Sequence, residues 1–475
     1  MAQYLHKSVP DIAALLRSGK VSAIALAEEA IDRHGRHGAQ LGAYKHWDEG
    51  KARAQARAAD AAFKAGCTLA PLHGIPSSVK DLFGLKGYPI FAGTPKRLPA
   101  SWEADGPVVA ALKRQLATIM GKTHTVEFAF GGVGSNTHWG TPRNPWGGKA
   151  HRASGGSSSG AGVSLGEGSA LVALGSDTGG SVRIPASVTG NVGLKLTINR
   201  WSCDGIVPLS PSFDTPGVLA RTVADTAYAF AALDPAGLDA DRFLAEIART
   251  ELSSLTLGIC ESFMWENLGP GIGEGAKRAL DEAVRKGVRL KTIDVPEFPE
   301  TYALHLKGSV LSAEFLQFLD DELPAWKDSM DATIRARVQD GGSISATEYI
   351  RRLRFIARKH RSVSARLAEV DALVMPTVPI TPPTVEAIAT LDGYIQHNRQ
   401  MFRHTCPVNN LALCALTLPV ARDKEGMPVG LQLVMRAGSE ERLLAVGHAL
   451  ERALGTAEKR LGKPPLNAIP KARTK

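Results

Sequence analysis

A stretch rich in serine and glycine has the most potential for chemistry in this sequence. Residues 153–187 read ASGGSSSGAGVSLGEGSALVALGSDTGGSVRIPAS, and nine of these 35 residues are serine. The composition fits a flexible linker, a phosphate-binding loop or the nucleophile region of a hydrolase. Within it, SALVALGSD has the pattern of a buried strand and SVRIPASVTG can begin a helix. Because a linker lacks such ordered elements, the linker interpretation is excluded.

Three short motifs of known enzyme classes match only in part. Residues 156–160 fit GxSxG, but that motif needs a strand directly before its serine, and the preceding HRAS has no apolar run. Residues 77–80 fit the SxxK motif of serine β-lactamases, yet the KTG partner is missing because His124 follows Lys122-Thr123. The segment 121–123 resembles the end of a P-loop, but Leu116 stands where that loop needs glycine.

The local pattern favours Ser181 as a nucleophile. The apolar run ALVALG enters a turn, SDTGG (176–180), and Ser181 opens the following helix. Backbone N–H groups around Gly179 and Gly180 can point into one concavity and bind an oxyanion. The positive end of the helix dipole would assist them. A serine that only caps the helix would give the same pattern, so both interpretations remain open on these residues alone.

A nucleophilic serine needs a base, and the sequence offers two kinds. The downstream histidines stand in no recognisable triad context. Lys80 lies in an apolar-flanked strand, and a lysine can act as a base when burial lowers its pKa to roughly 7–8. A single lysine is more often a surface charge. The residues by themselves therefore leave the base open.

Four segments together resemble the amidase signature family of serine hydrolases. Their texts are GIPSSVKD (74–81), GGSS (155–158), GSDTGGSVRIPA (175–186) and GLK (193–195). Weaker matches, GKTHTVEFA, TPRNPW, DALVMPT and GMPVGLQLV, stand in family order with them. The resemblance extends over residues 74–434, nearly the whole chain, and its central 30 residues are highly specific.

The resemblance implies a Ser–cis-Ser–Lys triad that hydrolyses a small carboxamide. By position, Ser181 is the nucleophile, Ser157 is the bridging serine that follows a cis peptide bond, and Lys80 is the base. A proton would pass from Ser181 through Ser157 to Lys80 and return to the departing ammonia or amine. The product would be a carboxylic acid, released from an acyl-enzyme by water.

The resemblance also assigns supporting residues. Ser158 is expected to donate hydrogen bonds near the oxyanion or the substrate, and Asp177 and Arg183 are expected to hold the loops. The family's oxyanion hole falls on the backbone N–H groups of Thr178, Gly179, Gly180 and Ser181.

The sequence departs from the family pattern near the expected site. Ser159 replaces a glycine in GGSSSGAG, and Leu196 replaces the proline of the usual GLKPT. Residues 407–409 read PVN but continue without the usual glycine and proline, and residues 147–154 (GGKAHRAS) also differ. No triad member is lost. Because such loops shape a pocket, the particular amide is not predicted.

The remaining elements must position these residues. Helical patterns after Ser8 and Ser22 and strands mixed with helices further along predict an α/β fold: a single large α/β/α domain with a central mixed β-sheet covered by helices. The expected organisation is an N-terminal helical segment packed on the core (1–65), a catalytic domain (66–457) and a basic, poorly ordered tail (458–475).

Composition limits the class of protein. Of 475 residues, 44% are hydrophobic and 22% charged, as in a soluble globular protein. The net charge of +9 comes largely from the tail, which holds six Lys/Arg against one Glu, so nucleic-acid binding is not expected. No apolar run of about 18 residues or signal-peptide pattern occurs, which predicts a cytoplasmic protein without a membrane span. A homodimer would be compatible with these features.

Metal and cofactor sites are not expected. The five cysteines are scattered without a CxxC pair, the histidines do not cluster, and no HExxH occurs.

The alternative to a free-standing amidase is the glutaminase subunit of a tRNA-dependent amidotransferase. Those subunits usually carry an Asp-rich segment after the nucleophile region, where this chain reads LDPAGLDADRF. A non-catalytic relative is a third interpretation, which an intact triad disfavours.

Overall fold

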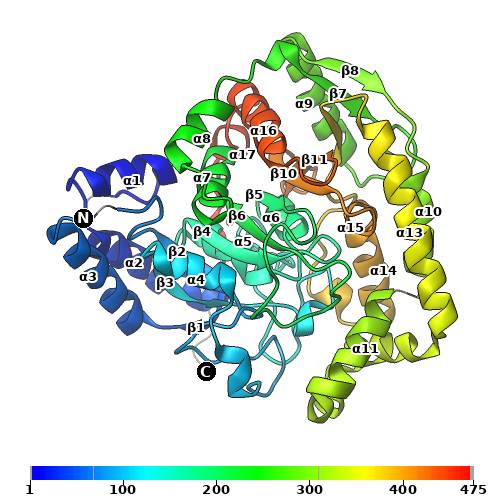
Figure 1. Ribbon diagram of the computed structural model, residues 1–475, viewed down its shortest axis with the longest axis horizontal. Coiled ribbons are helices and arrows are strands. Elements are labelled where there is room, and N and C mark those ends of the chain that lie inside the picture. Colours follow the sequence, from blue (N-terminus) through cyan, green and yellow to red (C-terminus); the bar gives the residue numbers. More distant parts are fainter. Residues whose placement is uncertain (1–2, 68, 309, 471–475) are drawn as a thin grey trace.

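The computed structural model describes residues 3–67, 69–308 and 310–470. Within these ranges eleven strands form one sheet in the order β1-β3-β2-β4-β6-β5-β10-β11-β9-β7-β8 (Figure 1). Strands β2 and β3, β2 and β4, β7 and β8, and β7 and β9 pair in parallel, and the other neighbours are antiparallel. The strands are β1 (Tyr44–Trp47), β2 (Pro76–Lys80), β3 (Thr118–Thr123), β4 (Val172–Ser176), β5 (Val192–Lys195), β6 (Pro216–Ala220), β7 (Thr256–Ile259), β8 (Arg289–Thr292), β9 (Ala372–Pro376), β10 (Cys414–Arg422) and β11 (Pro428–Met435).

Helices cover the sheet, and α10, α11 and α13 form one side of the molecule (Figure 1). Among the described helices, none is long and apolar enough to cross a membrane. The helices are α1 (Val9–Arg17), α2 (Ala23–Leu41), α3 (Glu49–Lys64), α4 (Pro107–Arg114), α5 (Ser159–Glu167), α6 (Arg183–Val188), α7 (Val223–Leu233), α8 (Ala240–Ile247), α9 (Ile272–Arg285), α10 (Glu297–Leu306), α11 (Val310–Glu322), α12 (Ala332–Gln339), α13 (Ala346–Leu367), α14 (Leu391–Phe402), α15 (Cys406–Asn410), α16 (Glu440–Leu454) and α17 (Ala457–Leu461).

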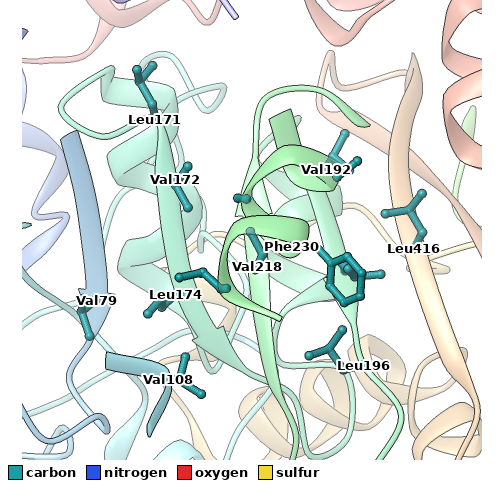
Figure 2. Close-up of a cluster of buried hydrophobic side chains, with 14 of the residues drawn as sticks. Val79, Val108, Leu171, Val172, Leu174, Val192, Leu196, Val218, Phe230 and Leu416 are labelled. Atoms are coloured by element: carbon teal, nitrogen blue, oxygen red, sulfur yellow. The ribbon is translucent and has the colours of Figure 1, made fainter. Parts of the chain in front are cut away.

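The layers follow from the alternation of side chains along buried strands. On β4, Val172 and Leu174 belong to the main core cluster together with Phe230 of α7. Between them, Ala173 points to the opposite face and packs in a cluster with Val182 beside α6. Figure 2 shows the first of these clusters, in which side chains from the sheet gather with Phe230. The predicted α/β/α arrangement with a central mixed sheet is therefore confirmed.

The helix starts that the sequence predicts are present. Ser8 caps α1 by accepting a hydrogen bond from Asp11 N, and Ser22 caps α2 by accepting one from Ala25 N. The first three helices also pack on the body: Val9 N donates to the Asp225 carboxylate on α7 over 2.6 Å. Their apolar faces join the same core cluster as the sheet.

The C-terminal segment differs from the expected solvated tail. Residues 457–461 form α17, and Leu461 is buried in a cluster with Trp146 and Met427. Ile469 packs in a second cluster with Leu41. Leu461, Leu466 and Ile469 thus pack this otherwise basic segment against the body, a signal that its composition conceals. Residues 471–475 lie outside the described ranges.

Strand β2 and strand β4 place the expected catalytic residues at one edge of the sheet. The two strands are parallel neighbours, so their carboxyl ends lie side by side. Lys80 ends β2, and the turn that carries Ser181 follows β4 directly. Helix α5, which begins after Ser157, packs across β2 and β4. Segments separated by about a hundred residues thereby converge on one point.

Candidate active site

Lys80 lies at the centre of the candidate site. Its side chain is fully buried, and its Nζ atom is 2.7 Å from Ser157 Oγ and 2.9 Å from Ser176 Oγ. Both distances are those of good hydrogen bonds. The contact with Ser157 is the one that the family resemblance implies. Ser176, the last residue of β4, is a second partner that the sequence did not single out.

Burial changes the protonation of this lysine. It lowers the pKa of Lys80 to about 7, although the negative charges of Asp177 and Asp214 act in the opposite direction. Desolvation dominates because a buried ammonium loses its hydration while neither carboxylate contacts it directly. The neutral amine is therefore accessible near pH 7. A neutral amine within hydrogen-bond distance of a serine hydroxyl can accept its proton.

Ser157 reaches Lys80 from the loop before α5. The peptide bond between Gly156 and Ser157 is cis, as the resemblance implies for the bridging serine. The Ser157 carbonyl accepts hydrogen bonds from Val126 N at 3.1 Å and Ser159 N at 2.8 Å. These bonds fix the backbone of Ser157, so its hydroxyl is held toward the lysine.

Ser181 lies beside this pair. It follows the turn after β4, is 1% exposed, and lines a cavity. Its backbone carbonyl accepts a hydrogen bond from Ser158 N at 3.2 Å, which ties the nucleophile turn to the Ser157 loop. Within the described part of the chain, Ser181 Oγ forms no hydrogen bond. The expected contact between the hydroxyls of Ser181 and Ser157 therefore remains a prediction.

The backbone N–H groups of the turn are not all available to an oxyanion. Gly180 N donates to Asp177 Oδ1 over 2.7 Å, so the prediction for Gly180 needs correction. Gly180 instead has a steric role: its φ is +135°, and a Cβ there would lie 2.1 Å from Thr405 Oγ1. The candidate oxyanion donors that remain are the N–H groups of Thr178, Gly179 and Ser181.

Asp177 and Arg183 form a buried ion pair behind the turn. Arg183 Nε donates to Asp177 Oδ2 and Arg183 Nη2 donates to Asp177 Oδ1, each over 3.0 Å, and neither side chain is exposed. The Arg183 guanidinium holds the pKa of the Asp177 carboxyl well below its usual range against the effect of burial. Asp177 also accepts from Val182 N over 3.1 Å. The pair therefore fixes the turn on both sides of Ser181.

Ser158 has a different contact from the predicted one. It is fully buried, and its hydroxyl donates to the Ser176 carbonyl over 3.3 Å. It therefore connects the Ser157 loop to the end of β4 and does not face an oxyanion or a substrate. The sequence could not show this, because the direction of a serine hydroxyl in a glycine-rich loop depends on the packing around it.

Several supporting residues come from distant segments and were missed. Asn409 Nδ2 donates to Asp177 Oδ1 over 2.8 Å, and Arg183 Nη1 donates to Gln432 Oε1 over 2.5 Å. Thr178 Oγ1 donates over 2.5 Å to the buried carboxyl of Asp214, whose pKa burial raises to about 6. The PVN text around Asn409 was the available signal for one of these contacts. Gln432 lies in the GMPVGLQLV match, which gave no hint of its contact with Arg183. Asp214 carries no local signal.

Comparison with known proteins gives this geometry a context. A family model described as amidase matches residues 25–444, most of the chain. The chain belongs to the amidase family. Members of that family hydrolyse carbon–nitrogen bonds of amides, so the protein is an amidase and an enzyme, as the sequence predicted.

Individual relatives agree with this assignment. The amidase is 44% identical over 461 residues to a 2-amino-5-chloromuconic acid deaminase of Comamonas testosteroni, covering 97% of this chain and 99% of the relative. It is 31% identical to a component of the glutamyl-tRNA(Gln) amidotransferase of Salinispora arenicola, covering 96% and 99%. A solved amidase structure superposes with a TM-score of 0.81 at 29% identity, covering 94% of this chain and all of the other.

A cavity lies beside Ser181, which is one of its lining residues. Thr178 and Gly179, whose backbone N–H groups are candidate oxyanion donors, also line the cavity. Aromatic and aliphatic side chains form most of its wall. In the ranges that the structure describes, no group of three His, Cys, Asp or Glu side chains could hold a metal ion.

Proposed function

We propose that this amidase hydrolyses a small carboxamide through an acyl-enzyme on Ser181, with Ser157 as the proton relay and Lys80 as the base. The observation that supports the proposal most strongly is the 2.7 Å distance between Lys80 Nζ and Ser157 Oγ in a fully buried environment. A buried lysine needs hydrogen-bond partners. Those of Lys80 are two serine hydroxyls, and the Ser157 hydroxyl can give it a proton.

Acylation follows from this arrangement. Neutral Lys80 takes the Ser157 proton, Ser157 takes the Ser181 proton, and Ser181 Oγ attacks the carbonyl carbon of the amide. The carbonyl oxygen becomes negative and is stabilised by the N–H groups of Thr178, Gly179 and Ser181. The carbon–nitrogen bond then breaks while the proton on Lys80 returns through Ser157 to the leaving nitrogen, which departs as ammonia or an amine.

Deacylation uses the same groups in reverse. A water molecule replaces the departed amine, and its proton passes to Lys80 through Ser157. The resulting hydroxide attacks the acyl carbon, and the bond between that carbon and Ser181 Oγ breaks. Ser181 recovers its proton, and the carboxylic acid leaves. Each proton that Lys80 accepts is returned within the cycle, so no metal ion or cofactor is required.

Two other candidate functions come from the names of relatives. The 44% identical relative is named a deaminase of 2-amino-5-chloromuconic acid, so release of ammonia from a small amino-substituted acid is a second candidate for this site. A glutaminase component of an amidotransferase complex is the other candidate, supported by a relative at 31% identity. The higher identity of the first relative favours an amidase or deaminase over the glutaminase component.

The purified protein alone is expected to release ammonia from simple amides, and replacement of Ser181 by alanine is expected to abolish this. Ser159→Ala is a matched control, because the buried Ser159 hydroxyl has no hydrogen-bond partner among the described residues. Both expectations are tested by measuring ammonia release from a panel of aliphatic, aromatic and urea-like amides, with the unaltered protein and with Ser181→Ala. Release only when a partner protein and tRNA are added would favour the glutaminase instead.

We further propose that the enzyme works in the cytoplasm, independently of metal ions and without nucleic acid. The scattered cysteines, which are free thiols in the structure, are consistent with a reducing compartment. A homodimer remains compatible with the proposal.

A further inference from the structure

Arg337 is the one formally charged side chain that lines the cavity beside Ser181, among the residues that the structure describes. It lies on α12, far in sequence from the catalytic turn. The rest of the wall is apolar or neutral, with aromatic side chains such as Phe130, Phe213 and Phe402. The Arg337 side chain is partly exposed, and it is the single formal charge that a molecule entering this cavity would meet, among the described residues.

The guanidinium of Arg337 is held in place by Phe130. Arg337 Nη1 donates to the Phe130 carbonyl over 2.7 Å, and Arg337 Cζ lies 4.1 Å from the centre of the Phe130 ring. The first contact uses one of the five donors of a guanidinium, and the second stabilises its charge through the face of the ring. The group is therefore fixed while most of its donors remain unused.

No carboxylate of the protein neutralises Arg337 directly. In the described ranges, no Asp or Glu oxygen lies within ion-pair distance of it. The acidic residue that begins its own helix, Asp331, is occupied elsewhere: its Oδ1 accepts from Thr333 N and its Oδ2 from Thr137 Oγ1, each over 2.8 Å. The positive charge of Arg337 is therefore free to pair with an acid group of a molecule that enters the cavity.

We propose that Arg337 binds a carboxylate of the substrate, so that the substrate is an amide that also carries an acid group. This inference rests on the proposed amidase reaction at Ser181, since both residues line one cavity. A planar guanidinium matches a carboxylate with two parallel hydrogen bonds, which would fix the orientation as well as the affinity of the substrate. The apolar wall would contact the carbon chain between the acid and the amide.

The histidine nearby fits the same assignment. His305 lines the cavity, and burial lowers its pKa to about 4, with the positive charge of Arg337 acting in the same direction. His305 is therefore neutral at pH 7 and leaves Arg337 as the single cation of the wall. A neutral imidazole can still donate one hydrogen bond to a carboxylate that Arg337 binds.

The first test compares pairs of substrates on the unaltered enzyme. The monoamides of succinic, glutaric and adipic acid are assayed beside butanamide, pentanamide and hexanamide, which carry a methyl group in place of the acid. At least one acid is expected to have a kcat/KM about 10- to 100-fold above its neutral partner, the range of charge-assisted hydrogen bonds. Equal or lower values for all the acids would overturn the proposal.

The second test removes the charge. Arg337→Met is expected to raise KM for the preferred acid by about 10- to 100-fold and to leave its neutral partner within about threefold. Arg337→Lys should recover part of the loss. Arg335→Met is the matched control, because Arg335 lies on the same helix, does not line the cavity, and donates only to the Asp328 carbonyl over 3.4 Å. An equal loss for the acid and the neutral amide would show a structural role instead.

A binding measurement separates this inference from the proposed reaction. Adipate is titrated by calorimetry into Ser181→Ala protein and into the same protein with Arg337→Met. At least tenfold weaker binding without the guanidinium would support the carboxylate site even if no amide in the panel were hydrolysed. If the enzyme hydrolyses amides but the two proteins bind adipate with the same affinity, the inference is overturned and the proposed function stands.

Discussion

Replacement of Lys80 by methionine is expected to lower kcat/KM about 10²- to 10⁴-fold while the fold survives, the range for loss of a general base. Methionine has a similar length and no charge, so it fills the space of a side chain that is already fully buried. The loss should appear in kcat rather than in KM, because Lys80 acts on protons and lies behind Ser157. Steady-state kinetics and a thermal melt measure the two parts of the prediction.

Lys195→Met is the matched control for this change. Lys195 is also fully buried on the sheet, but its Nζ donates to the carbonyls of Leu196 and Leu413 over 2.8 and 2.9 Å, away from the serines. Its loss leaves two carbonyls unpaired, so the melting temperature should fall while kcat changes little. Retention of full activity by Lys80→Met would contradict the assignment of the base.

The pH dependence of the unaltered enzyme gives the same prediction a second readout. Below about 7, the pKa to which burial lowers Lys80, the amine is protonated and cannot act as a base. The kcat/KM should therefore rise about tenfold per pH unit on the acidic side and level off above the pKa. A profile that is flat between pH 5.5 and 8.5, or that falls with rising pH in this range, would contradict the role of Lys80.

Asp177→Asn or Arg183→Met is expected to destabilise the protein by about 3–5 kcal/mol, because each leaves the other charge buried without its partner. The effect on activity should be large as well. Asp177 accepts hydrogen bonds from the backbone N–H groups of Gly180 and Val182, on either side of Ser181. Urea unfolding followed by circular dichroism measures the loss of stability.

The double variant Asp177→Asn, Arg183→Met separates the pair from its surroundings. It should be more stable than the sum of the two single changes predicts, since neither charge then remains unpaired. Arg242→Met is a control for charge alone, because Arg242 pairs with Glu246 on the exposed face of α8, and its unfolding midpoint should not change. Single variants as stable as the unaltered enzyme would show that the pair does not hold the turn.

The features that the sequence could predict were those with local signals. A buried strand, a glycine turn and a helix start stand next to one another around Ser181, so the strand–turn–helix segment that carries the proposed nucleophile could be predicted. The capping serines Ser8 and Ser22 could be predicted for the same reason. The family resemblance supplied Lys80 and Ser157, because burial of a lysine and its distance from a serine depend on the three-dimensional fold.

The features that could not be predicted depend on contacts between distant segments. Whether the Gly180 N–H faces an oxyanion or Asp177 depends on the orientation of the peptide. The direction of the Ser158 hydroxyl, which donates to the Ser176 carbonyl at the end of β4, likewise depends on the packing around it. Gln432 reaches Arg183 across 249 positions of sequence. Arg337 enters the cavity from a helix whose pattern is ordinary for a surface helix. The sequence around Gly180, Ser158 and Gln432 shows that these segments match the family, but it does not show which groups they contact.

Covalent labelling tests the central claim of a Ser181 nucleophile most directly. A fluorophosphonate probe reacts with an activated serine and stays attached to it, and peptide mass spectrometry then identifies that serine. The structure predicts a label on Ser181 in the native enzyme and its loss in Lys80→Met. A label on Ser158, the serine of the GxSxG text, would contradict the proposed mechanism.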